Sequence, residues 1–205
     1  KRITGCNTAG YSTTGVSELA IGLIVDVSRK ITTLEHYTRN QQSRNGFLGR
    51  EIAGKTAGII GTGAIGTQTA HILKAMGAHV IASSRTERKE ITEAGIEYVD
   101  MEKLLQKSDI VSLHLPSTKE TYHMIGENQL AIMKDSAILI NTARGPVVDY
   151  QALSNALNNG TISGAGIDVY EKEPPIEPDH PLLNAPNTVL TPHIAYATHE
   201  AMKLR

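Results

Sequence analysis

Three side chains that could share one reaction, Arg144, Glu173 and His193, lie at or just beyond the ends of apolar segments with the pattern of buried strands. In a parallel sheet the carboxyl ends of the strands meet at one edge, and ligands bind outside that edge. Hydride transfer to a ketone leaves negative charge on oxygen, and a protonated imidazole at His193 could donate the neutralising proton. These residue types therefore match carbonyl reduction.

The other two side chains have complementary tasks in such a reaction. A carboxylate at Glu173, bonded to the second ring nitrogen of His193, would fix the tautomer and favour the protonated ring. The planar guanidinium of Arg144 can bind a substrate carboxylate through two parallel hydrogen bonds, which a lysine cannot offer. The three residues thus predict a substrate that carries both a carbonyl and a carboxylate.

A hydride donor is indicated by the stretch from Gly54 to Arg85, which reads as an apolar strand, a glycine turn, a helix and a second apolar strand. In a dinucleotide-binding unit the first glycine, Gly61, makes the tight turn and Gly63 lets the backbone approach a pyrophosphate. Gly66 lets the helix pack closely on the strand. The helix N-terminus then offers its unpaired N–H groups to the phosphates. We therefore expect a bound dinucleotide.

Alternating strand and helix patterns surround these residues. The near-continuous apolar strands predict an α/β fold, a Rossmann-type doubly wound parallel sheet with helices on both faces. Ile72, Leu73 and Met76 are expected to face the sheet, and Asp149 to cap the last helix. We expect strands at 56–60, 78–82, 96–99, 110–115, 137–140, 163–169 and 188–190, and helices at 65–76, 101–107, 127–133 and 149–159.

The first 53 residues lie outside this alternation. Residues 1–13 read as an extended lead-in, and a helix is expected from about residue 14, with Thr14 able to cap it. Ile21 and Val25 lie off its apolar face, so that second side is either exposed or packed against another subunit. Residues 32–53 are polar and lack periodicity, which predicts a long arm that wraps a partner. The apolar face itself consists of Val16, Leu19, Ala20, Leu23, Ile24 and Val27.

Composition excludes several classes of protein. The chain has 205 residues with 40% hydrophobic and 20% charged residues, and its net charge is −1, so nothing draws it to nucleic acid or to a membrane surface. Cys6 is the only cysteine, which excludes an intrachain disulfide, suits a reducing compartment and predicts a cytoplasmic protein. One cysteine and scattered histidines offer no zinc-ligand spacing.

His114, at a strand end, either lines the cofactor cleft or only packs against its neighbours in the fold.

Taken together, the motifs GIIGTGAIG, LHLPSTKETYHMI, NTARGPVVD, GAGIDVYEKEPP and NTVLTPHIA resemble those of the D-isomer-specific 2-hydroxyacid dehydrogenases, in family order and spacing over nearly the whole chain. The resemblance implies that Arg144, Glu173 and His193 are the catalytic residues. It implies a homodimer formed through residues 14–50. It also implies cofactor contacts from Ala64, Ile65, Leu115, Pro116, Thr121, Thr142, Ala143, Arg144, Asp168 and His193.

One departure from the family pattern concerns the cofactor. Members that prefer NAD usually carry an aspartate at the end of the second strand, where this chain has Ser84 followed by Arg85. Without that aspartate nothing repels a 2′-phosphate, and Arg85 can pair with it. We therefore expect NADP(H) to bind at least as well as NAD(H). The alternative is that Arg85, Arg88 and Lys89 form a solvated helix start.

A second departure is the extent of the match. The family builds its substrate domain from an N-terminal segment and a C-terminal return, and this chain has neither in full. We expect residues 1–53 to be a lead-in, dimerisation helix and arm belonging to the cofactor domain. Residues 54–193 are expected to form the NAD(P)-binding Rossmann domain, and residues 194–205 the start of the return to the substrate domain.

Several functions compete on this evidence. The NTAGYST opening and TPHIAYAT ending are most similar to glycerate dehydrogenases and to hydroxypyruvate or glyoxylate reductases. A dinucleotide-sensing co-repressor is the rival, because such relatives retain the three catalytic residues. Formate dehydrogenases typically have glutamine where this chain has Glu173. Methyltransferases also use glycine-rich turns, but they have no task for the three charged residues.

Overall fold

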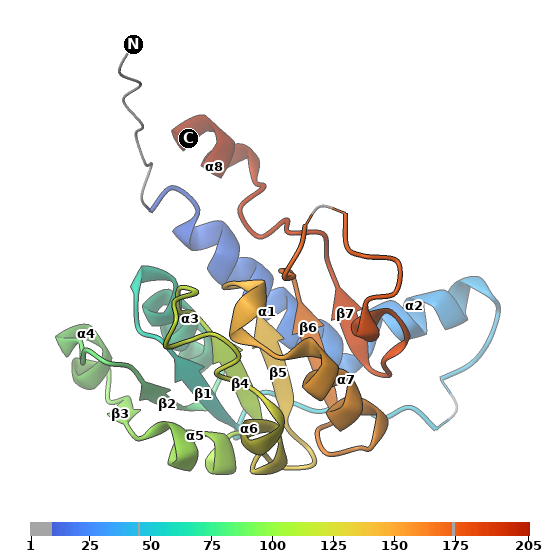
Figure 1. Ribbon diagram of the computed structural model, residues 1–205, viewed down its shortest axis with the longest axis horizontal. Coiled ribbons are helices and arrows are strands. Elements are labelled where there is room, and N and C mark those ends of the chain that lie inside the picture. The colour runs from blue at the N-terminus through green and yellow to red at the C-terminus, as the bar shows by residue number, and fades with distance from the viewer. Residues whose placement is uncertain (1–9, 45, 174) are drawn as a thin grey trace.

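A seven-stranded parallel sheet with the strand order β3-β2-β1-β4-β5-β6-β7 forms the centre of the molecule (Figure 1). The computed structural model describes residues 10–44, 46–173 and 175–205, so most of the expected lead-in lies outside the described residues. The order reverses between β1 and β4, which creates a crevice at their carboxyl ends. The strands are β1 (Thr56–Ile60), β2 (His79–Ser83), β3 (Glu97–Tyr98), β4 (Ile110–Leu113), β5 (Ile138–Asn141), β6 (Gly164–Ile167) and β7 (Thr188–Leu190).

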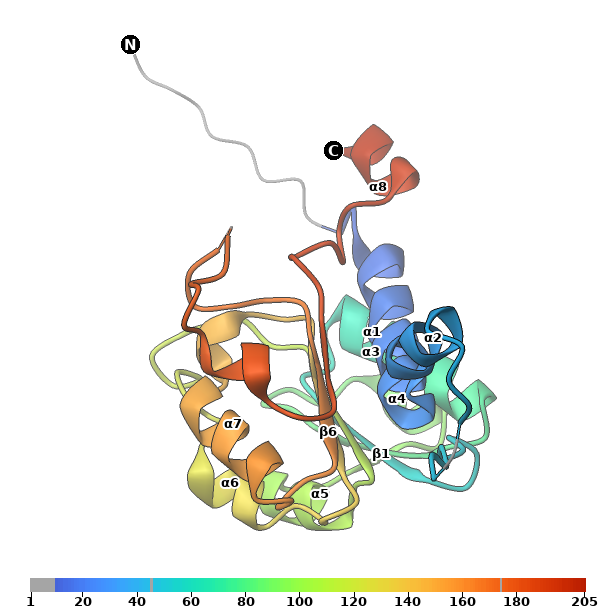
Figure 2. The ribbon, with the colours of Figure 1, turned by 90° about the vertical axis from the view of Figure 1, so that its right-hand side faces the viewer.

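Helices cover both faces of the sheet, as Figure 2 shows from the edge. Side chains alternate along β5: Ile138 and Ile140 join the core under α1 and α3, while Leu139 joins the core under α5, α6 and α7. This arrangement confirms the expected doubly wound α/β fold. The helices are α1 (Thr13–Arg29), α2 (Ile31–Arg39), α3 (Ala64–Ala75), α4 (Lys89–Glu93), α5 (Met101–Lys107), α6 (Glu127–Ala131), α7 (Tyr150–Asn158) and α8 (His199–Leu204).

The expectation of an irregular segment over residues 32–53 is wrong for its first part. Lys30 adopts a left-handed conformation with φ 56°, which ends α1 and allows α2 to start in a new direction. α2 buries none of its side chains, so it has no apolar stripe from which periodicity could be read. The exposed ion pair between Arg39 and Glu35, one turn apart, gives α2 a small local stabilisation.

Smaller corrections concern helix ends and faces. α1 begins at Thr13, so Thr14 lies inside the helix, and Ser12 precedes it without a side-chain cap. Leu73 of α3 is fully buried as expected, but Met76 is 37% exposed and lies just after the helix end at Ala75, so it does not face the sheet. Asp149 caps α7 as expected, accepting the N–H of Ala152 at 3.0 Å. The five-residue α4 begins at Lys89, within the basic stretch that the sequence also allowed as a solvated helix start.

Candidate active site and cofactor cleft

Two adjoining cavities lie at the carboxyl edge of the sheet, and we name them by position. The outer cavity, about 460 Å³, is lined by the turn after β1 and by the segment after β2. The inner cavity, about 340 Å³, is lined by Arg144, His193 and the start of α1. His114, Leu115 and Pro116 line both cavities and form the wall between them. Together they extend along the crevice between β1 and β4.

The glycine turn has the geometry that a pyrophosphate needs. Gly61 has φ 93°, and a Cβ there would lie 2.5 Å from the carbonyl oxygen of His114. A Cβ on Gly66 would lie 2.0 Å from the carbonyl oxygen of Gly61, so α3 packs directly on the turn. At Gly63, in contrast, a Cβ would meet no atom within 4 Å. The turn is therefore tight on its inner side and open where a phosphate would approach the uncapped N-terminus of α3.

The expected contact between His193 and Glu173 is present. The imidazole Nδ1 lies 2.8 Å from the Glu173 carboxylate, and the two side chains are 33% and 22% exposed. Because Nδ1 is engaged, Nε2 is the ring nitrogen left for a substrate. The ring of Tyr196 packs edge-to-face with the imidazole, at 89° and with 5.4 Å between the centroids. This contact restricts the movement of the His193 ring.

Asp168 holds the segment that carries His193. Its carboxylate is fully buried and accepts hydrogen bonds from the Thr191 hydroxyl at 2.6 Å and from the N–H groups of Ile194 and Ala195, both at 2.9 Å. His193 itself adopts φ 55°, a conformation that a non-glycine residue keeps only when its neighbours are fixed. The cofactor contact expected for Asp168 remains a prediction, and its visible task is to position His193.

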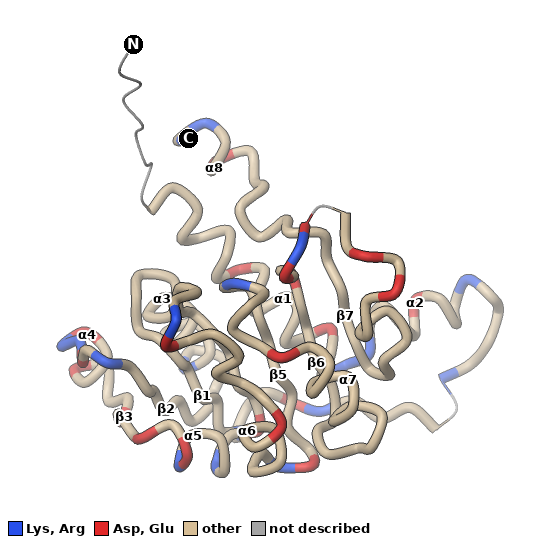
Figure 3. Tube along the Cα trace, viewed as in Figure 1, with Lys and Arg blue, Asp and Glu red and all other residues tan. Residues whose placement is uncertain are grey.

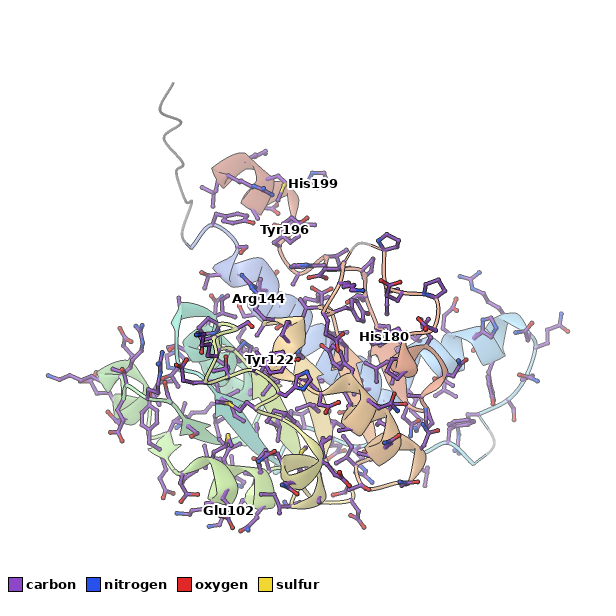
Figure 4. All side chains as sticks on the ribbon, in the orientation of Figure 1. Glu102, Tyr122, Arg144, His180, Tyr196 and His199 are labelled. Atoms are coloured by element: carbon purple, nitrogen blue, oxygen red, sulfur yellow. The ribbon has the colours of Figure 1, made fainter. Side chains whose placement is uncertain are left out.

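Arg144 follows β5 in a segment held by the fully buried Asn141. The amide of Asn141 donates to the carbonyl oxygen of Arg144 at 3.0 Å and accepts the N–H of Ala143 at 3.0 Å. A Cβ on the next residue, Gly145, would lie 2.0 Å from the backbone of Tyr170, so this segment packs against the one leading to Glu173. Figure 4 shows Arg144 and Tyr196 on the same side of the sheet, and both line the inner cavity.

A buried hydroxyl tests whether a cofactor fits the inner cavity. Thr142 is 5% exposed, and its Oγ1 has no hydrogen-bond partner among the described residues. A buried hydroxyl without a partner costs about 1–3 kcal/mol. Thr142 lines the inner cavity, so a polar ligand group placed there would satisfy it. The unpaired Thr142 hydroxyl and the open turn at Gly63 together fit a dinucleotide. A polar group of that ligand bonded to Thr142 would share the inner cavity with Arg144 and His193.

Most of the other residues implied by the family resemblance lie on these cavities. The outer cavity is lined by Ser84, Arg85 and Thr121, and the inner one by Ile65 and Ala143. Ala64 and Asp168 line neither. The residues that sequence reasoning missed reach the cavities from distant segments or through backbone turns: Tyr11, Ser12, Val16, Thr62, Met101, Glu120, Met124, Ala195 and Tyr196. Of these, Thr62, Glu120, Met124 and Ala195 lie inside the five family motifs, and Tyr11, Ser12 and Tyr196 lie in the NTAGYST opening and the TPHIAYAT ending, whereas Val16 and Met101 lie outside all of these stretches.

His114 both lines the cleft and packs, which settles the two alternatives. Its Nε2 lies 2.9 Å from the Ser112 hydroxyl, and desolvation of the ring lowers its pKa from 6.5 to about 4. The ring is therefore neutral at neutral pH. The buried His180 binds Glu171 at 3.2 Å instead and lies outside the two cavities.

Acidification should destabilise the chain through His114. The unfolded chain binds a proton near pH 6.5, whereas the buried ring resists it until the pKa of about 4. The free energy of unfolding should thus fall as pH drops through that window, by about 3 kcal/mol in total. Urea unfolding at a series of pH values measures it. His114→Gln cannot titrate, so its curve should lack this part of the slope, and parallel curves for the two proteins would contradict the assignment.

Neither a metal centre nor a membrane segment is found in the described part of the chain. No group of three or more His, Cys, Asp and Glu side chains there could hold a metal ion. Within the same residues, no helix is both long and apolar enough to cross a bilayer.

Comparisons with known proteins show the family of the chain. The family model described as D-isomer specific 2-hydroxyacid dehydrogenase, NAD binding domain, matches residues 21–195. Glyoxylate reductases of Korarchaeum cryptofilum and Thermococcus litoralis are 46% and 47% identical to 95% of the chain, which spans 60% and 61% of their lengths. The crystal structure of D-lactate dehydrogenase from Aquifex aeolicus, complexed with NAD and lactic acid, matches 95% of the chain and 63% of its own with a TM-score of 0.88 and 35% identity.

Proposed function

Because the chain belongs to the D-isomer-specific 2-hydroxyacid dehydrogenase family, we propose that it is the cofactor-binding part of an enzyme that transfers a hydride between NAD(P)H and a 2-ketoacid. The observation that carries this proposal is the His193–Glu173 pair, 2.8 Å apart, with His193 on the same cavity as Arg144 and beside an open glycine turn. Proton donor, carboxylate binder and dinucleotide turn are the three parts that such a reaction requires.

Each residue then has a defined task. The bound dinucleotide would supply the hydride. Arg144 binds the carboxylate of the ketoacid and sets the orientation of its carbonyl. His193 donates the proton on Nε2 to the carbonyl oxygen as negative charge develops there, while Glu173 holds Nδ1 and balances the imidazolium charge. In the oxidation direction His193 takes the hydroxyl proton back.

A panel of 2-ketoacids tests this function. A full-length protein that contains this chain should reduce glyoxylate and hydroxypyruvate, in keeping with the glyoxylate reductases among its relatives. The assay follows NADH and NADPH consumption with glyoxylate, hydroxypyruvate and pyruvate. Failure to reduce any of them with either cofactor, despite cofactor binding, would count against the reductase and favour the co-repressor alternative.

Arg85→Ala should weaken NADPH binding selectively. Ser84 and Arg85 line the outer cavity, and Figure 3 shows the basic cluster that continues from there into α4. A charge-assisted hydrogen bond contributes about 1.5–3 kcal/mol, so the dissociation constant for NADPH should rise about tenfold or more. That for NADH should change less than about twofold. Fluorescence titration measures both, with Arg39→Ala on α2 as the matched control. Equal losses for both cofactors would contradict a 2′-phosphate contact.

The proposal includes a homodimer formed through residues 14–50. α2 buries no side chain, and Ile31 and Leu48 are 49% and 79% exposed. Figure 1 shows α2 projecting from the body of the domain. Apolar side chains on a projecting arm suit an obligate-type interface. A monomer in sedimentation at micromolar concentration would contradict it.

A cytoplasmic location is proposed as well, because one cysteine suits a reducing compartment.

A further inference from the structure

A relay of three hydrogen bonds joins the glycine turn to the segment that follows β2. The N–H of Arg88 donates to the Tyr98 hydroxyl at 3.0 Å, and that hydroxyl donates to Thr62 Oγ1 at 2.8 Å. Thr62 Oγ1 donates in turn to the carbonyl oxygen of Thr86 at 3.5 Å, a long and weak bond, so the two bonds made by the Tyr98 hydroxyl hold the segment most firmly. Each hydroxyl thus donates once and accepts once, an order in which neighbouring hydrogen bonds polarise and strengthen one another.

The relay fixes Ser84 and Arg85, which line the outer cavity. At the start of the segment, the N–H of Gly61 donates to the carbonyl oxygen of Ser83 at 2.8 Å. Ser84 and Arg85 therefore lie between one anchor on the glycine turn at Ser83 and the relay at residues 86 and 88. Both anchors start from the same turn, so the distance between the pyrophosphate site and Ser84–Arg85 is set by hydrogen bonds.

Tyr98 acts here without lining the outer cavity. It belongs to the two-residue edge strand β3, where it pairs with Ala82 of β2 and packs against the core under α1 and α3. Thr62, its acceptor, is 1% exposed. The sheet and the core therefore hold the Tyr98 ring, and its hydroxyl transmits that fixed position to the exposed segment after β2.

We propose that Tyr98 is a positioning residue for cofactor choice: through Thr62 and the backbone of Arg88 it places Ser84 and Arg85 where they meet a 2′-phosphate, and so sets the discrimination between NADP(H) and NAD(H). This inference rests on the proposed NADP(H) site. A segment that is already ordered loses little conformational entropy when a ligand binds to it. The resulting gain in affinity applies to the cofactor whose 2′-phosphate contacts Ser84 and Arg85. NADH, which has no 2′-phosphate, gains little from this placement.

Tyr98→Phe tests the hydroxyl alone, because the ring stays in β3 and in the core. The discrimination ratio is the dissociation constant for NADH divided by that for NADPH, measured by fluorescence titration of the 205-residue chain. The ratio should fall about fivefold in Tyr98→Phe, with NADH binding changed less than about twofold. Tyr37→Phe, on α2 and remote from the cavities, is the matched control.

Substitutions at Thr62 separate positioning from a general loss of stability. Thr62→Val keeps the shape but removes the hydroxyl, so it should lower the ratio like Tyr98→Phe, and the double variant should be no worse than either single one. Thr62→Ser restores a hydroxyl and should restore the ratio. Equal weakening of both cofactors in Tyr98→Phe, or full additivity in the double variant, would overturn the positioning role.

Comparison with Arg85→Ala distinguishes this inference from the cofactor proposal. A lower ratio in both Arg85→Ala and Tyr98→Phe supports both. A lower ratio in Arg85→Ala alone overturns the role of Tyr98 and leaves the cofactor proposal standing. If the ratio falls in Tyr98→Phe alone, positioning stands and Arg85 is not the phosphate partner. Unchanged ratios in both variants overturn both.

Discussion

Replacing His193 by glutamine should lower the turnover number for 2-ketoacid reduction by about 10²–10⁴-fold in a full-length protein that contains this chain. Glutamine cannot carry the proton that the carbonyl oxygen needs. Its amide can still bond to Glu173, so the segment held by Asp168 should keep its shape. The dissociation constants for NADH and NADPH should therefore change less than about threefold.

Steady-state kinetics with glyoxylate and direct cofactor titration together test this expectation. His71→Gln, on the exposed side of α3 and away from both cavities, is the matched control and should behave as the unsubstituted protein. A His193→Gln protein that keeps a tenth or more of the turnover would mean that another group donates the proton.

Glu173→Gln extends the same argument to the partner of His193. The carboxylate 2.8 Å from Nδ1 orients the imidazole and balances its positive charge, and a neutral amide cannot balance that charge. The turnover number for 2-ketoacid reduction in the full-length protein should therefore fall, by less than in His193→Gln. An unchanged turnover number would show that Glu173 does not act on His193.

The parts of the site that could be predicted from sequence are those encoded locally. Arg144, Glu173 and His193 each follow an apolar run, and such runs become parallel strands whose carboxyl ends converge. The glycine turn is likewise specified within six residues, and the positive φ of Gly61 and the tight packing at Gly66 follow from it. For these positions, the residue type and a place just after an apolar run are enough to predict the site.

The rest depends on contacts across the fold, which spacing does not encode. Tyr98 and Thr62 are 36 residues apart and meet only because β3 pairs next to β2. Tyr11, just before α1, lines the inner cavity with Tyr196, and the two rings lie 5.9 Å and 6.0 Å from the guanidinium of Arg205. α2 escaped prediction for the opposite reason: it buries nothing and so leaves no pattern.

The 205-residue chain on its own should fold and bind dinucleotide. Two apolar cores, one on each face of a complete seven-stranded sheet, give it the interior of an independent domain. The glycine turn, the uncapped start of α3 and both flanking strands are present, so the pyrophosphate site does not depend on further sequence.

The same chain should reduce 2-ketoacids at less than about 1% of the rate of a full-length family member. It spans only 60% and 61% of the length of the glyoxylate reductases that it resembles. Arg144 is exposed, and the His193 side chain is one-third exposed, so water screens the charge that should hold the ketoacid. Orientation against the nicotinamide and exclusion of water both need a second wall over the inner cavity.

NADPH consumption with glyoxylate and hydroxypyruvate measures the rate, with the Thermococcus litoralis glyoxylate reductase as the full-length control. Turnover near that of the control would show that the 205-residue chain already closes the site around the substrate.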